Sequence, residues 1–210
     1  MTESALVKKR GRPAKMPQQH PDTRKALIRC GTAILTEQGF TASGLDGILK
    51  RVGVPKGSFY YYFANKEAFV REIIDYYGCY FVRKLDKFLL DETRLPLTRI
   101  QAFIDDAARG MAKYDFKRGC LVGNLGQEIG ILPESYRQQL SAILLDWQRR
   151  LAQCLQLARS AGQLGPQADC DALAEYFWIG WEGAVMRARL ANSARPLACF
   201  ADGFFAGLPR

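Results

Sequence analysis

The sequence predicts an all-α protein, with an N-terminal helix-turn-helix domain followed by a larger C-terminal helical domain. Beyond residue 20 of the 210-residue chain, apolar side chains recur at helical spacing in one segment after another. No stretch alternates between apolar and polar residues with period two, and β-branched residues are few, so no segment is a good strand candidate. Glycine and proline separate the helical segments, as at Pro133, 162–166 and Pro196.

The chain begins with an expected flexible basic arm at 1–20, whose Lys and Arg residues come without apolar periodicity. The first helix, of about four turns, begins near Asp22 and ends at Gly39, because glycine suits a helix C-terminus. This helix opens the domain that we place at 21–68.

Two short helices follow. Ser43 can cap the first of them, with Asp46 three residues on as in a weak capping box, and Gly53 ends it. Pro55 suits the start of the next helix, at 56–63, because the N–H that proline lacks would be unpaired there anyway. A helix, a glycine-containing turn and a second short helix together form a helix-turn-helix.

The rest of the chain, placed in a second domain at 69–210, is also helical. Asn65 is a good cap for a long helix that continues to Leu89. The later helical segments are 97–113, 119–130, 134–162, 170–192 and 197–206. One apolar stripe suits either a dimer interface or the intramolecular core; it consists of Leu140, Leu144, Trp147, Leu151 and Leu155.

The positive charge is concentrated near the N-terminus. The net charge is +9, and residues 1–72 hold 13 Lys and Arg against 6 Asp and Glu, a net of +7. Residues 73–210 hold 17 against 15, a net of only +2. A polyanionic partner is therefore expected at the N-terminal third.

Several function classes are excluded by what the chain lacks. A single histidine, His20, argues against histidine metal sites and a Ser-His-Asp triad. Six scattered cysteines without a C-x-x-C pair argue against zinc ribbons and a disulfide framework, and suit a reducing cytosol. There is no apolar run long enough for a membrane span and no signal core. We expect a cytoplasmic protein without metal, cofactor or membrane.

The second short helix has a surface that a structural role does not explain. Phe59 and Phe63 can pack inward, while the polar and tyrosine side chains between them cannot all be buried. The major groove of DNA accepts such a helix, and positive charge around it supplies affinity through phosphate neutralisation. The alternative is a small basic hairpin with a tyrosine-rich solvent face.

The run G-V-P-K-G-S-F-Y-Y-Y-F-A-N-K-E-A-F at 53–69 strongly resembles the DNA-binding signature of the TetR family of bacterial transcriptional regulators. The resemblance implies that Lys56 and Tyr60 face bases and that Gly57 allows close approach. It implies phosphate contacts for Ser58, Tyr61, Tyr62 and Lys66, and a backbone contact near Ser43. Tyr62 departs from the pattern, since histidine is common at this position, but a tyrosine hydroxyl can also donate to phosphate.

Helix order and length match this family along nearly the whole chain. The resemblance therefore implies a C-terminal domain that dimerises and binds an inducer, and a homodimer is expected to match a palindromic double-stranded operator. The segments 134–162 and 170–192 are candidates for the interface.

The arm contains Arg10-Gly11-Arg12-Pro13, the core of an A·T-hook. By analogy with homeodomain arms, Arg10 and Arg12 are expected to enter a minor groove next to the helix-turn-helix site. The alternative is a solvated charge run that only raises solubility.

Glycines at 119, 123, 126 and 130 share one helical face, and Gly180 and Gly183 form a second bare patch. Because interior glycines destabilise a helix, we expect a structural or functional reason for these glycine-rich faces. Two glycine-faced helices framed by Trp178 and Trp181 are expected to enclose a small pocket. Tight helix packing without a cavity is the alternative.

The stretches R-G-C-L at 118–121 and W-I-G-W-E-G-A at 178–184 resemble the acrylate-responsive and electrophile-sensing subgroup of the family. The resemblance nominates Cys120 as a sensing thiol and the pocket for a small, reactive carboxylate or carbonyl compound. Arg118 and a helix N-terminus would favour the thiolate. A buried inert cysteine is the alternative, with a carboxylate then held reversibly by Arg187 or Arg189. The candidate effector residues are Cys120, Asn124, Gln127, Glu128, Trp178, Trp181, Glu182 and Arg187.

The predicted function is a dimeric, ligand-controlled transcriptional repressor of a bacterial cytoplasm and nucleoid, not an enzyme. A non-specific architectural DNA-binding protein is one alternative. A thiol-dependent enzyme using Cys120 is another, weakened by the absence of a pocket histidine or phosphate-cradling motif.

Overall fold

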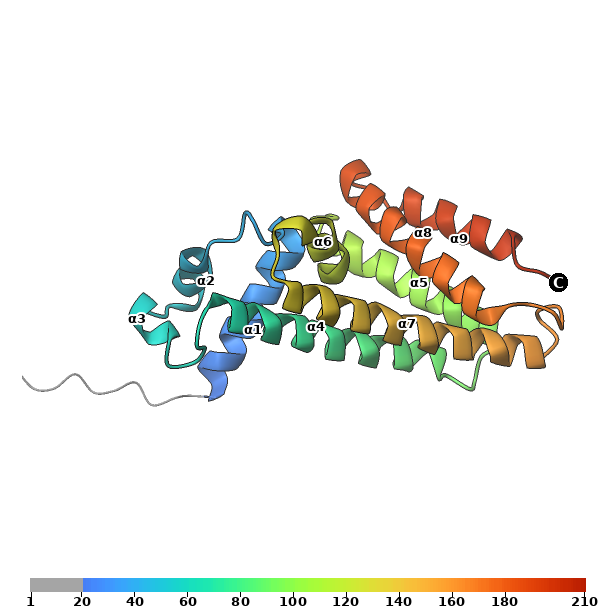
Figure 1. The fold of residues 1–210 in the computed structure, drawn as a ribbon. Helices are drawn as coiled ribbons and strands as arrows, with labels where there is room; N and C mark the ends of the chain where they lie inside the picture. Colours follow the sequence, from blue (N-terminus) through green and yellow to red (C-terminus); the bar gives the residue numbers. More distant parts are fainter. Residues whose placement is uncertain (1–20) are drawn as a thin grey trace, which may run out of the picture.

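The computed structural model describes residues 21–210, which fold as helices joined by short connections (Figure 1). This part of the chain contains no strand, which confirms the all-α prediction. The predicted arm, with Arg10 and Arg12, lies outside the described residues. The elements are α1 (Pro21–Gln38), α2 (Leu45–Val52), α3 (Lys56–Phe59), α4 (Lys66–Leu89), α5 (Pro96–Ala112), α6 (Leu121–Gln127), the 3₁₀ turn η1 (Ile129–Ile131), α7 (Glu134–Ser160), α8 (Cys170–Ala191) and α9 (Arg195–Ala206).

The predicted helix ends are confirmed where a local cap decides them. Gly53 adopts a left-handed conformation with φ of 73° after α2, a backbone that glycine adopts without strain. The Asn65 side chain accepts a hydrogen bond of 2.7 Å from the Ala68 N–H at the start of α4. The predicted helix at 119–130 is shorter, because it divides into α6 and η1.

The predicted capping box at the start of α2 is wrong. The N-cap residue is Gly44, which has an extended backbone and no side-chain cap. Ser43 is buried, and its hydroxyl donates to the Gly39 carbonyl at the end of α1. The Ser43 side chain is thus used inside the fold and faces no phosphate in this conformation.

The N-terminal domain packs α1, α2 and α3 against the beginning of α4. Phe59, Phe63 and Phe69 form an aromatic cluster with ring centroids 4.6–5.4 Å apart, which anchors the short α3 from beneath. On α1, a Cβ at Gly31 would clash with the end of the Ile73 side chain, so α1 and α4 approach closely there.

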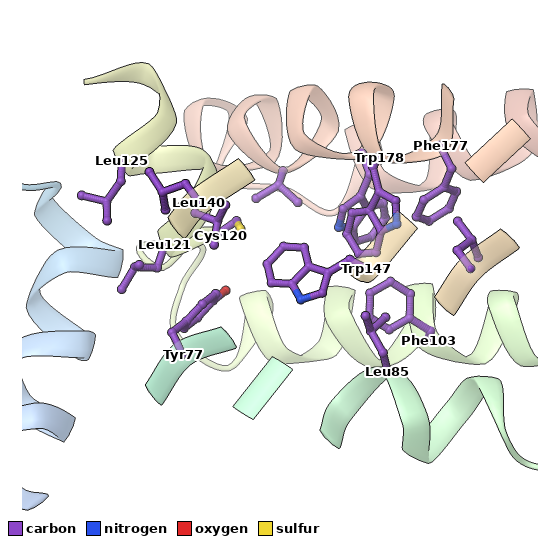
Figure 2. Close-up of a cluster of buried hydrophobic side chains, with 14 of the residues drawn as sticks. Tyr77, Leu85, Phe103, Cys120, Leu121, Leu125, Leu140, Trp147, Phe177 and Trp178 are labelled. Carbon is purple, nitrogen blue, oxygen red and sulfur yellow. The ribbon is translucent and has the colours of Figure 1, made fainter. Parts of the chain in front are cut away.

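The C-terminal domain is a helical bundle in which α7 packs against α4, α5 and α8, and α9 covers α8 (Figure 1). Trp147 of α7 is fully buried at its centre, with its ring 4.1 Å from Phe81 and 5.2 Å from Trp178 (Figure 2). The stripe predicted on this helix belongs to this core, since Leu140, Trp147, Leu151 and Leu155 are all buried. No helix within residues 21–210 is long and apolar enough to span a bilayer.

Candidate functional site

The exposed surface of the helix-turn-helix lies at the end of the molecule opposite α9 (Figure 1). Because Phe59 turns inward, the other side of α3 and the turn after it face outward. A Cβ at Gly57 would meet nothing within 4 Å, so another molecule can approach the backbone there. The predicted DNA contacts exposed on this surface are Lys56, Gly57, Tyr60, Tyr61 and Lys66, with Ser58 and Tyr62 half-buried beside them.

Both lysines predicted to contact DNA already have partners within the domain. The Lys66 ammonium lies 4.2 Å above the Phe40 ring centroid. The Lys56 ammonium lies 3.0 and 3.2 Å from the two carboxylate oxygens of Asp46 on α2, and this contact raises the pKa of Lys56. Sequence reasoning treated Asp46 as a capping residue and missed this pair, because no spacing rule links positions in two different helices.

A second candidate site is a cavity of about 420 Å³ between α1, α4, α5, α8 and the segment that leads into α6. Most of its wall is apolar or aromatic, with a few polar groups, as is typical of small-molecule sites. Cys120, Trp181 and Glu182 are the sequence candidates that line it. Further wall residues include Arg29, Thr36, Tyr76, Tyr77, Tyr80, Phe81, Lys84, Met111, Tyr114 and Arg118.

Cys120, Tyr77 and Glu182 form the polar centre of this cavity. Cys120 caps α6, and its sulfur accepts a hydrogen bond of 3.4 Å from the Gly123 N–H. The Tyr77 hydroxyl and the Glu182 carboxylate lie near the Cys120 thiol, close enough to affect its pKa. Figure 2 shows Tyr77 and Cys120 together on the same side of Trp147. Glu182 Oε1 is enclosed and has no hydrogen-bond partner among the described residues.

The Cys120 thiol keeps its proton, and Glu182 loses its own less readily than an ordinary carboxyl group. Burial, followed by the neighbouring Glu182 carboxylate, raises the pKa of the Cys120 thiol well above its usual value. Burial also raises the pKa of Glu182 to about 7. The expected thiolate is therefore wrong for the resting protein. Arg118 does not help to form it, because its guanidinium is bonded to Glu37 at 2.8 Å and lies 3.9 Å over the Tyr114 ring.

Gly119 and Gly123, at the start of α6, lie against side chains of α8, whereas Gly126 and Gly130 meet no neighbour within 4 Å. A Cβ at Gly123 would overlap the Glu182 carboxylate, and one at Gly119 would lie 2.7 Å from Arg189 Cδ. The predicted pocket between two glycine-faced helices is wrong, because Gly180 faces Phe200 of α9 instead of α6. The cavity lies beside the contact of Gly119 with α8, and residues of α4 and α5 form part of its wall.

Three polar residues join α6 and α8 to the end of α1, and we call Asn124, Glu128 and Arg189 the α1 bracket. Asn124 Nδ2 donates to the Thr36 carbonyl at 3.0 Å. Arg189 donates to Asn124 Oδ1 at 3.0 Å and to the Glu37 carbonyl at 2.7 Å.

Glu128 completes the bracket at the turn between α1 and α2. Its carboxylate accepts from the backbone N–H groups of Phe40 and Thr41, each at 2.8 Å, and from the Thr41 hydroxyl. Partial burial raises the pKa of Glu128, but these hydrogen bonds outweigh burial and lower it overall. Asn124 and Glu128, predicted to bind a ligand, thus bind the N-terminal domain instead.

The remaining effector candidates do not line the cavity. Trp178 is buried in the core against Trp147. Gln127 and Arg187 are exposed on the surface outside the cavity wall. Periodicity predicted the correct helix for each of these residues, but it did not predict which side of each helix faces the cavity. No group of His, Cys, Asp or Glu within 21–210 is arranged to hold a metal ion.

Comparison with known protein families matches both halves of the chain. Residues 27–73 match the family of bacterial regulatory proteins of the tetR type, and residues 96–204 match the tetracyclin repressor-like C-terminal domain.

Individual relatives match over nearly their full length. The chain is 48% identical to the transcriptional regulator AcuR of Cereibacter sphaeroides, over 93% of this chain and 89% of AcuR. It is 29% identical to the transcriptional repressor NemR of Escherichia coli K12, over 84% of this chain and 88% of NemR. A solved regulatory protein TetR from Rhodobacter sphaeroides superposes with a TM-score of 0.87 at 48% identity, over 89% of this chain and 98% of that one. The reduced form of E. coli NemR superposes with a TM-score of 0.80 at 28% identity, over 87% and 95%.

Proposed function

This chain belongs to the TetR family of ligand-responsive transcriptional regulators, which are not enzymes, and from that premise we propose a specific switch. A homodimer binds a palindromic operator at the bacterial nucleoid and leaves it when a small, reactive carboxylate or carbonyl compound enters the cavity. The observation that carries this proposal is the position of Cys120. Its thiol lies beside Glu182 in the cavity wall, at the first turn of α6. Further along the same segment, Asn124 and Glu128 of the α1 bracket bind the end of α1 and the turn after it.

The exposed surface of α3 supports the operator contact. A single turn of helix reads few base pairs, so specific recognition needs two copies on two half-sites. Lys56, Gly57 and Tyr60 face outward toward the bases in this proposal, and Ser58, Tyr61, Tyr62 and Lys66 approach phosphates. The basic arm with Arg10 and Arg12 adds a minor-groove contact.

One face of α8 supports the homodimer. Tyr176, Ile179, Met186 and Leu190 lie on it at helical spacing and are 61%, 70%, 39% and 80% exposed. Large apolar side chains in an exposed row mark a protein interface. A second copy of α8 can cover this row, because two-fold dimers pair the same surface of both subunits.

The proposed reaction adds the Cys120 sulfur to an α,β-unsaturated carbonyl compound. The Glu182 carboxylate accepts the thiol proton, and the sulfur forms a bond to the β-carbon as the carbon–carbon π bond breaks. The resulting enolate then takes a proton at its α-carbon from the Glu182 carboxyl group. A carboxylate on the ligand can lie toward Arg29 in the wall, instead of the predicted Arg187 and Arg189, while the nearby Lys84 is paired with Asp106 at 2.9 Å.

In this proposal, the new group at Cys120 acts on α6 by displacing the neighbouring Glu182 carboxylate. Glu182 lies directly on Gly123, so displacing the carboxylate pushes on the first turn of α6. The α1 bracket carries this movement to the end of α1 and the turn before α2. A change in the angle of the two DNA-binding domains then breaks the match to the operator.

The test measures operator release by footprinting and fluorescence anisotropy on DNA upstream of the gene. We expect wild-type protein to protect a two-fold-symmetric site and to release it after treatment with an acrylate-like acid, an enal or a quinone. Cys120→Ser should stay bound, whereas Cys79→Ser, which changes an exposed cysteine, should release normally. Full release of the Cys120→Ser variant would remove the covalent step, and uniform binding without a protected site would favour an architectural protein.

A further inference from the structure

The DNA-facing domain carries one acidic residue whose position needs an explanation. Between Gln38 and Lys66, Asp46 is the only Asp or Glu in the sequence, against Lys50, Arg51 and Lys56. A carboxylate on a surface that binds phosphates weakens binding through charge repulsion. Its presence there indicates a use that compensates for this repulsion.

Fold stability does not supply that use. The Asp46 and Lys56 side chains are 73% and 66% exposed, and exposed ion pairs contribute little to stability. Asp46 does not cap α2 either, because Gly44 stands at the N-cap without a side-chain bond. The pair connects the first turn of α2 to the first residue of α3, so it lies where both helices present their N-terminal ends outward.

The surroundings of the pair are bare. Gly47 follows Asp46 directly, Gly44 stands two residues before it, and Gly57 follows Lys56. A Cβ built on any of these three glycines would have no neighbour within 4 Å. The backbone at these three glycines is therefore open, and a base-pair edge can come into contact with both charged groups at once.

We propose that Asp46 and Lys56 act together to read one G·C base pair in each operator half-site. Guanine O6 accepts a hydrogen bond from cytosine N4 across the pair, so these two atoms are about 2.9 Å apart. Lys56 Nζ and Asp46 Oδ1 are 3.0 Å apart, nearly the same spacing. The ammonium can therefore donate to guanine O6 while the carboxylate accepts from cytosine N4. This inference rests on the proposed operator binding.

The arrangement discriminates against A·T. Along the major-groove edge, G·C presents two adjacent acceptors, N7 and O6, followed by the cytosine donor. Lys56 can use both acceptors without moving away from Asp46. On A·T, Asp46 would accept from adenine N6 only by lying next to the adenine N7 acceptor, which repels it. Lys56 would then face thymine O4 beside the thymine methyl group.

The experiment selects binding sites from a random duplex library with the full-length wild-type protein and with Asp46→Ala and Lys56→Ala. Wild-type protein should select a two-fold-symmetric site with a strong G·C preference at one position in each half. Each variant should lower that preference about tenfold at this same position and leave the other positions unchanged. Asp105→Ala on α5 removes the same charge from an exposed site far from α3 and should change no position.

The outcomes separate this inference from the operator proposal. If wild-type protein selects no symmetric site, the proposed function itself fails. If it selects one and Asp46→Ala only strengthens binding to every sequence equally, Asp46 merely neutralises Lys56 and does not read a base. If Asp46→Ala and Lys56→Ala lose base preference at different positions of the site, the two residues do not recognise one base pair together, and the proposal is wrong. Unchanged melting temperatures of both variants will show that the fold is intact.

Discussion

At the scale of single residues, proton positions decide how the cavity can react. Cys120 is a protonated thiol in the resting protein, because burial and Glu182 raise its pKa. Only the thiolate attacks electrophiles, so the proton must leave first. Glu182, with a pKa of about 7, is about half ionised at neutral pH and lies beside the thiol. A carboxyl group of ordinary pKa would be a weaker base for this step.

Replacing Glu182 by Gln should slow the modification of Cys120 and change its pH dependence. In wild-type protein, the rate should rise as Glu182 loses its proton through about pH 7 and then level off. In Glu182→Gln, burial still raises the pKa of the thiol although the carboxylate charge is gone, so the rate should stay low through neutral pH because no base takes the proton. Intact-protein mass spectrometry after timed exposure to an enone between pH 5.5 and 8.5 measures this.

Glu175→Gln, on an exposed position of the same helix, is the matched control. A Glu182→Gln variant with the wild-type pH profile would show that Glu182 does not accept the proton.

At the scale of elements, α6 connects the cavity to the DNA-binding domain. Its first turn holds Cys120 and Gly123 against Glu182, and Glu128 after its last turn holds the α1–α2 turn. The helix has only seven residues, so its two ends are about two turns apart. Sequence reasoning predicted a ligand-binding helix here and missed that half of its polar groups bind α1.

Replacing Glu128 by Ala should uncouple the two domains. The variant loses the hydrogen bonds to Phe40 and Thr41, and we expect a loss of about 1–3 kcal/mol in the free energy of unfolding. Operator affinity should fall about tenfold, because the DNA-binding domain is held less firmly, while the rate of Cys120 modification should not change.

Chemical denaturation, anisotropy and mass spectrometry measure these three quantities. Glu134→Ala removes an exposed acid that pairs only within α7 and serves as the control. A parallel loss of Cys120 reactivity in Glu128→Ala would mean general unfolding instead of uncoupling.

At the scale of the whole molecule, the exposed row on α8 is the proposed dimer interface. Tyr176, Ile179, Met186 and Leu190 lie on the side of α8 away from the Trp147 core. A dimer through this face places α3 of each subunit at the outer end of the assembly. Two half-sites on one duplex then become accessible to the pair of helices.

Replacing Ile179 by Glu should convert the dimer to a monomer, because two like charges would be buried against each other. Operator affinity should fall at least a hundredfold, since each half-site is then bound alone. Analytical ultracentrifugation and anisotropy measure both effects. Leu95→Glu changes another exposed apolar residue, 62% exposed, and should remain dimeric. A dimeric Ile179→Glu variant would place the interface elsewhere.

The sequence by itself determined the order of the helices, the Gly53 turn, the Asn65 cap and the inward pair Phe59 and Phe63. These features depend on neighbours within a few residues, which the local pattern records.

Only the tertiary structure decided which side chains meet. Glu182 comes 62 positions after Cys120 in the sequence, yet packs on the first turn of α6. Arg118 forms an ion pair with Glu37 of α1, and Asp46, which was predicted to cap a helix, pairs with Lys56 instead. The physical reason is that the rotation and crossing of packed helices set these contacts, and periodicity within one helix does not determine how it is turned against another.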